Sequence, residues 1–138
     1  MDHESKKKEW SKITIGTREY AFEDIPGEEA VFLSLKLLNV FGSAFCGLLG
    51  ESDGSGLDVM VSRIASGVNP TEAMGIFKAV IPRTFVNEGG SGHRATFDDF
   101  QGRTIEFYKV MFACIRYNFA DFFAEGPLSG LAQGVSHA

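Results

Sequence analysis

Residues 99–123, DFQGRTIEFYKVMFACIRYNFADFF, carry the clearest periodicity in the chain. Apolar side chains recur along this stretch at spacings of three and four residues, which is the pattern of one face of an α-helix. The members of this seam are Ile105, Tyr108, Phe112, Ile115, Phe119 and Phe122. A helix of this length would span about 35 Å. We therefore expect residues 99–123 to form a long helix that acts as the spine of the domain.

Upstream of this stretch, further helices are predicted. The first covers residues 27–49, and the second covers residues 57–66. The third begins at Asn69, a good capping residue, and Pro70, which suits a first helical turn, and it runs to about residue 80. The apolar stripe of the first helix is formed by Val31, Leu35, Leu38, Phe45 and Leu49, and it is widened by Phe32, Leu37, Phe41 and Leu48.

Two short β-hairpins are predicted beside the helices. Residues 13–22 alternate apolar and polar side chains around the turn residues Gly16-Thr17, which favours a hairpin with one apolar face. The segments 84–86 and 94–96 flank the glycine-rich stretch 87–93, which we interpret as a long and mobile hairpin tip. The fold class is therefore mainly α (α+β), with about four helices, a long C-terminal helix and one or two small hairpins.

A single helical domain is predicted over residues 12–124, because 138 residues are typical of one domain and no linker interrupts the chain. Residues 1–11 are polar and are expected to form a disordered tail. Residues 125–138 are rich in glycine and lack a clear period, so we expect them to form a flexible tail.

The charge and hydropathy of the chain argue against nucleic-acid and membrane partners. The formal net charge is −5, whereas a nucleic-acid binder usually presents a basic face. The charged amino-terminal segment lacks the apolar core of a signal peptide. No apolar run approaches the length that spans a bilayer. We therefore expect a cytosolic protein that binds neither nucleic acid nor membrane.

No constellation of catalytic or metal-ligating residues stands out in the sequence. His3 and His137 lie in the termini, and His93 lies in the glycine-rich tip, where solvation is expected. These positions form neither a catalytic triad nor a metal-ligand set. The adjacent Asp98 and Asp99 are interpreted as helix-capping residues. No catalytic residue, cofactor or metal is predicted.

The two cysteines, Cys46 and Cys114, lie far apart within apolar segments. Neither belongs to a CxxC motif or lies beside a histidine in the sequence, as a redox or catalytic cysteine often would. We interpret both as small, buried apolar side chains.

The aromatic residues near the end of the long predicted helix form the candidate binding site. The chain contains 13 phenylalanines, and phenylalanine offers a large apolar area with no polar group. Two interpretations remain open: a helix end packed under the hairpins, or a partly exposed apolar patch for a partner. The proposed partner-binding residues are Phe107, Met111, Phe112, Phe119, Phe122 and Phe123.

Three motifs, taken in order, resemble those of phage tail assembly chaperones. Ile13–Tyr20 is similar to the Ile-Thr-Ile-Gly-x-Arg-Glu-Tyr hairpin of that family. Ile25-Pro26 then leads into a leucine-rich helix that contains Leu33–Leu38. The segment Asn118–Phe123 is similar to the closing Asn-Phe-(Gly/Ala)-Asp-Phe-Phe signature. The resemblance covers roughly residues 12–124.

The resemblance implies a helper protein that acts in the host cytoplasm and is absent from the virion. Such a helper binds the tape-measure protein, and tail-tube protein as well, and keeps them soluble before tail assembly. The wide apolar face of the last predicted helix also favours a homo-oligomer. A minor structural component of the phage tail or connector is the alternative, because small size and hairpins would suit it too. A third hypothesis, an enzyme or small-molecule binder, lacks a convergent set of polar residues.

Overall fold

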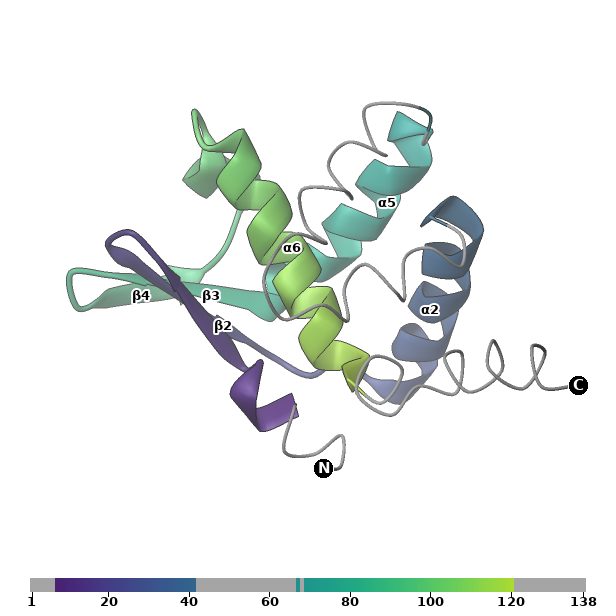
Figure 1. The fold of residues 1–138 in the computed structure, drawn as a ribbon, viewed down its shortest axis with the longest axis horizontal. Helices are drawn as coiled ribbons and strands as arrows, with labels where there is room; N and C mark the ends of the chain where they lie inside the picture. The colour runs from purple at the N-terminus through teal and green to yellow at the C-terminus, as the bar shows by residue number, and fades with distance from the viewer. Residues whose placement is uncertain (1–6, 42–66, 68, 121–138) are drawn as a thin grey trace, which may run out of the picture.

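A computed structural model describes residues 7–41, 67 and 69–120 of the chain. Within these residues, two β-hairpins enclose the helices α2 and α5 in the sequence, and helix α6 comes last. Figure 1 shows α6 between the sheet and the other two helices. The predicted α+β fold class, with helices and small antiparallel hairpins, is confirmed.

Four antiparallel strands form one sheet in the order β1-β2-β3-β4. Their bounds are Lys12–Ile15 for β1, Arg18–Phe22 for β2, Thr84–Glu88 for β3 and Ser91–Arg94 for β4. Both predicted hairpins are confirmed. The sequence did not predict that they would join, through pairing of β2 with β3 that sets Tyr20 opposite Val86.

The hairpin turns depend on glycines with positive φ. Gly16 has a φ of 61° in the first turn, and Gly89 and Gly90 have φ values of 61° and 82° in the second. In the second hairpin Glu88 pairs directly with Ser91, so only two residues form the turn. The prediction of a long, mobile tip over residues 87–93 is therefore wrong. Two consecutive glycines supply the left-handed conformations that a tight type I′ turn requires.

Helices α2 and α5 begin where the sequence predicted. Helix α2 covers Gly27–Phe41, and α5 covers Pro70–Val80. The side chain of Asn69 caps α5 by accepting hydrogen bonds from the backbone N–H groups of Thr71 and Glu72, at 2.9 and 3.1 Å. The chain then continues into the 3₁₀ turn η1, Ile81–Arg83. Residues 42–49 and the helix predicted over 57–66 lie outside the described residues.

Helix α6 is shorter than predicted and covers Thr104–Asn118. The residues before it form a separate 3₁₀ turn, η2, at Phe97–Phe100. Gly102, between η2 and α6, has a φ of 77°, which a right-handed helix does not allow. The predicted start at residue 99 is therefore wrong, because the backbone at Gly102 separates η2 from α6. Residues 121–123 of the predicted helix lie outside the described residues.

Aromatic side chains from three helices meet in the core. The Phe112 side chain has no solvent exposure. Its ring lies 5.8 Å from that of Phe77 on α5 and 5.7 Å from that of Phe41 on α2, in both cases edge to face. This geometry is favourable for aromatic pairs. On the sheet, Tyr20 and Val86 are buried in the same cluster.

The described part of the N-terminal segment is ordered against the domain. Residues 7–9 are helical, and Trp10 is buried. The Arg116 guanidinium lies over the Trp10 ring, 4.6 Å from its centroid. The structure thus differs from the predicted disordered tail over residues 7–11, because a large aromatic ring gains by covering α6.

Candidate functional site

The structure buries most of the residues proposed from the sequence as the partner-binding site. Phe107 and Phe119 are 7% and 5% exposed, and Met111 and Phe112 are 0% exposed. These four side chains pack inside the domain and cannot contact a partner in this conformation. The remaining two, Phe122 and Phe123, lie outside the described residues.

Helix α6 is buried because it is apolar on nearly every side. Six consecutive residues, Val110–Ile115, are buried. A helix that is hydrophobic all round belongs in the interior, whereas a surface helix carries a single apolar stripe. Of the predicted seam, Phe112, Ile115 and Phe119 are buried and Ile105 is exposed. The buried residues beside the seam, such as Met111 and Cys114, place the middle of the helix inside.

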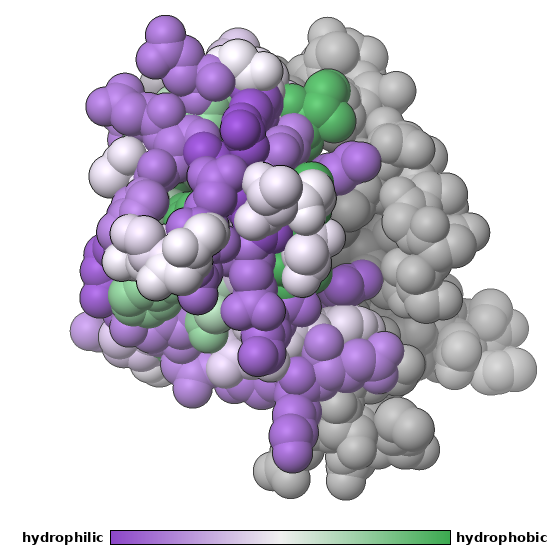
Figure 2. Space-filling model, turned by 90° about the vertical axis from the view of Figure 1, so that its left-hand side faces the viewer, coloured by the Kyte–Doolittle hydropathy of each residue, from purple (hydrophilic) through white to green (hydrophobic). Residues whose placement is uncertain are grey.

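Among the described residues, the most exposed large apolar side chains lie on α2. Val31, Phe32 and Leu35 are 63%, 61% and 62% exposed, respectively. We call these three residues the α2 outer face. Figure 2 shows a different side of the molecule, the one with the hairpin turns, and there hydrophilic side chains predominate.

Helix α2 carries apolar residues on two opposite faces. Leu33, Leu37 and Phe41 are buried against the core. Val31 and Leu35 were assigned to the stripe of this helix from the sequence, but they point away from the core. A rotation of about 100° per residue puts the two sets on opposite sides of the helix. The predicted stripe is therefore wrong for Val31, Phe32 and Leu35. Its members Leu37 and Phe41 are buried, together with Leu33.

Charged residues border the α2 outer face. Glu28 lies in the first turn of α2, four residues before Phe32. The Lys36 ammonium lies 5.8 Å from the centroid of the Phe32 ring. A Cβ atom placed on Gly75 of α5 would lie 3.8 Å from Lys36 Nζ, so Lys36 reaches from α2 to the surface of α5. The face thus has an acidic residue at one end and a basic residue at its side.

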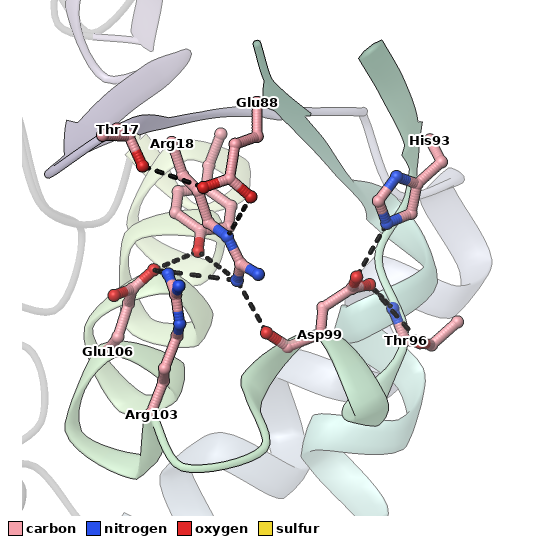
Figure 3. Close-up of polar contacts among 9 residues, drawn as sticks. Thr17, Arg18, Glu88, His93, Thr96, Asp99, Arg103 and Glu106 are labelled. Carbon is pink, nitrogen blue, oxygen red and sulfur yellow. Dashed lines mark hydrogen bonds and ion pairs between the residues drawn. The ribbon is translucent and has the colours of Figure 1, made fainter.

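A polar cluster beneath the hairpin turns has a structural role (Figure 3). Arg18 Nε donates to Glu88 Oε1 at 3.2 Å, and Arg18 Nη1 donates to the backbone oxygen of Asp99 at 2.6 Å. The Tyr20 hydroxyl donates to Glu106 on α6. Burial raises the pKa of Tyr20 to about 12. These bonds join both hairpins to α6, and the charged groups satisfy one another.

His93 and Asp99 form a second polar contact at the start of η2. His93 Nε2 lies 2.7 Å from Asp99 Oδ1, and Asp99 Oδ2 accepts from the backbone N–H of Thr96 at 2.8 Å. Burial opposes ionisation of Asp99, but the bonds from Thr96 and His93 outweigh it and hold the pKa of this carboxyl below its usual value. The capping role predicted for Asp99 is confirmed, although it caps η2. His93, predicted to be solvated, is half exposed and bonded.

Asn118 joins the end of α6 to the segment that precedes α2. Its Oδ1 atom accepts from the backbone N–H of Ile25 at 2.8 Å. Its Nδ2 group donates to the backbone oxygens of Glu23 and Cys114, at 3.2 and 3.1 Å. The segment Asn118–Phe123, whose aromatic residues were proposed as partner contacts, therefore begins with a residue that stabilises the fold. An asparagine at the end of an apolar helix was the only indication in the sequence.

The described residues include no cluster of metal ligands, and the cysteine among them is buried. No group of three or more His, Cys, Asp and Glu side chains in these residues could hold a metal ion. Cys114 is buried, as predicted, and burial raises the pKa of its thiol to about 12, so it stays protonated and unreactive at neutral pH. Cys46 lies outside the described residues. None of the described helices is long and apolar enough to cross a membrane.

Comparison with known proteins gives the family. No curated protein and no solved structure is significantly similar to the chain. The model of one family, described as phage tail assembly chaperone protein, matches residues 16–132. This match covers strand β2, the second hairpin, the helices α2, α5 and α6 and the Asn118–Phe123 motif. The chain therefore belongs to the phage tail assembly chaperone family.

Proposed function

We propose that this protein binds the tape-measure protein, the tail-tube protein or both, and keeps them soluble in the host cytoplasm until the tail assembles. Membership of the family, which is non-catalytic, supports the general role of a chaperone for tail proteins. The choice of clients is our proposal. The observation that carries it is the exposed α2 outer face, since large exposed apolar side chains in a cluster mark interaction sites.

The composition of the chain suits a protein that holds apolar clients. An exposed apolar face promotes aggregation, and a net charge of −5 opposes it by mutual repulsion. The core beneath this face is rich in aromatic contacts, so the surface is carried by a helix that packs against that core through Phe41. A helper of this kind can present apolar area to a client without unfolding itself.

Co-expression with the tape-measure protein and with the tail-tube protein of the same phage tests this proposal. We expect the soluble fraction of at least one of them to increase, and a tagged chaperone to retain it in a pull-down. The matched control is a small acidic protein of similar size expressed at the same level. If neither tail protein is solubilised or retained, the proposed function is wrong.

Purified virions distinguish this function from a role as a minor tail or connector component. Quantitative mass spectrometry of particles should find the tube protein in many copies and this chain absent. A fixed, stoichiometric amount of this chain in mature particles would favour the structural role.

Phe122 and Phe123 remain proposed partner contacts at the end of the chaperone-like domain. Replacing both with serine should weaken retention of the client if they contribute to binding. Unchanged retention would remove them from the binding surface.

A further inference from the structure

We propose that the α2 outer face is the docking surface for an amphipathic helix of the tape-measure protein. This inference rests on the proposed function and adds to it the surface and the form of the bound segment. It moves the binding site from the aromatic end of α6 to the face of α2 that points away from the core.

The arrangement of side chains on α2 suits a second helix. Val31 and Leu35 are four residues apart, and the half-buried Leu38 follows three residues later. This spacing forms a ridge along the helix, and another helix can pack its own side chains beside such a ridge. Phe32 widens the ridge toward α5, where Met74 is 39% exposed. Helix-in-groove binding uses apolar anchors at matching spacings on the partner.

The area of the face favours a single helix over a second copy of the whole chain. Three large apolar side chains, each about three-fifths exposed, present on the order of 300 Å² of apolar surface. A stable interface between two folded proteins buries about 800 Å² on each partner. A single helix that packs along α2 needs only a narrow strip of apolar surface. The α2 outer face is therefore large enough for one helix but too small for an interface between two copies of the chain.

The charges beside the face define the sequence expected of the bound helix. Glu28 lies at the amino end of α2, and Lys36 lies beside Phe32. A complementary helix would carry a basic residue near Glu28 and an acidic residue near Lys36. Between them it would carry apolar residues at positions i, i+3 or i+4, and i+7. Such a pattern can be sought in the tape-measure sequence before any experiment.

Among the residues that the structure describes, the other exposed large apolar side chains are more scattered along the chain or less exposed. Ile105 is 55% exposed at the start of α6. Phe97 is 39% exposed, but its ring already packs 5.6 Å from that of Phe107. Single exposed apolar residues are common on folded proteins and need no partner. Ile105 therefore provides a matched control for loss of exposed apolar area.

The first test combines Val31→Gln, Phe32→Gln and Leu35→Gln in the full chain. Glutamine keeps a high helix propensity, so we expect the midpoint of urea unfolding to stay close to that of the wild type. Tape-measure protein retained in a pull-down should fall by at least about tenfold, as expected when central apolar contacts are lost. The control Ile105→Gln should retain the wild-type amount.

The outcomes separate this inference from the proposed function. If the wild type retains tape-measure protein and the triple variant retains as much, the docking surface is wrong and the chaperone function stands. If the wild type retains neither tail protein, the proposed function itself fails.

Photocrosslinking identifies the occupant directly. A photoreactive benzoylphenylalanine at position 32, in cells that also express the tape-measure and tube proteins, should crosslink to helical segments of the tape-measure protein. Position 105 should give no such product. Crosslinks from position 32 that reach only the tube protein, a second copy of this chain or another part of the same chain would overturn the inference.

Discussion

Asn118 shows how one polar side chain fixes the relation between two distant segments. Its Oδ1 atom accepts from Ile25 N–H, and its Nδ2 group donates to two backbone oxygens, on Glu23 and Cys114. Removing a partner from a partly buried hydrogen bond costs the desolvation of the group left behind. A residue with three such bonds stabilises the fold more than its small size suggests.

We predict that Asn118→Ala lowers the free energy of unfolding by about 1–3 kcal/mol, because the Ile25 N–H loses its acceptor. The measurement is urea denaturation followed by circular dichroism. Asn39→Ala, at an exposed position on α2, is the control and should change stability by less than about 0.5 kcal/mol. Equal effects of the two substitutions would show that the Asn118 bonds contribute nothing.

Tyr20 predicts a dependence of stability on alkaline pH. Burial raises its pKa to about 12 in the folded protein, against about 10 in an unfolded chain. The neutral phenol therefore stabilises the fold fully below pH 10, and this contribution is lost as the pH rises toward 12.

For Tyr20→Phe we expect a loss of about 1.5–3 kcal/mol at pH 8, because the bond to the Glu106 carboxylate disappears. The difference between wild type and variant should shrink between pH 10 and 12, since only the wild type can ionise this phenol on unfolding. Urea denaturation at several pH values between 8 and 12 measures this difference in the free energy of unfolding. Tyr108→Phe is the control, because the ring of Tyr108 makes its contacts with Phe77 and Phe107. If the difference in free energy of unfolding between the wild type and Tyr20→Phe stayed constant from pH 8 to 12, the raised pKa of Tyr20 would be refuted.

At the scale of elements, the glycine before α6 ends one helical segment and allows the next to begin. Gly102 has a φ of 77°, and a Cβ atom placed on it would meet no other atom within 4 Å. For an L-residue this backbone conformation costs about 1–2 kcal/mol. Gly27, the first residue of α2, also has open space and does not have a positive φ.

We predict that Gly102→Ala lowers the melting temperature and that Gly27→Ala leaves it unchanged or raises it slightly. The first substitution strains the backbone, and the second only restricts the unfolded chain. The expected difference between the two variants is about 1–2 kcal/mol by thermal or urea denaturation. If Gly102→Ala proved as stable as Gly27→Ala, the break between η2 and α6 would not depend on that conformation.

The elements that could be predicted from the sequence are those set by local chemistry. Asn69 and Pro70 marked the start of α5, and Gly16 marked the first turn, because caps and tight turns need particular residues at particular positions. The pairing of β2 with β3 could not be predicted, since α2 and α5 separate these strands in the sequence. The break at Gly102 was missed because hydrophobic spacing alone does not report φ.

The candidate site was misplaced for a related reason. Spacing of apolar residues identifies a stripe on a helix but does not say whether the stripe faces the core or solvent. Phe112 and Met111 were predicted to bind a partner, but both are buried in the hydrophobic core. Val31 and Leu35 looked like core residues and are exposed. Only the packing of the whole molecule decides between the two faces of α2.

At the scale of the whole molecule, the central pairing of the sheet makes two distant segments depend on one another. Tyr20 of β2 and Val86 of β3 lie opposite each other, and both are buried. Asn118 ties the segment after β2 to α6, and Arg18 ties β2 to the η2 backbone. We therefore expect the described residues between 12 and 120 to unfold as a single cooperative unit.

Hydrogen exchange followed by mass spectrometry tests this expectation with Asn118→Ala. If one unit unfolds, the substitution should accelerate exchange in β2 and in β3 by the same factor, about tenfold for each 1.4 kcal/mol of lost stability. The edge strand β4 should exchange faster than β3 in both proteins, because its outer backbone groups are not paired within the sheet. Asn39→Ala should leave all rates unchanged. Faster exchange in β2 with unchanged exchange in β3 would mean that the hairpins open separately. In that case the sheet would join two independent units, and a single domain would be the wrong description of this chaperone.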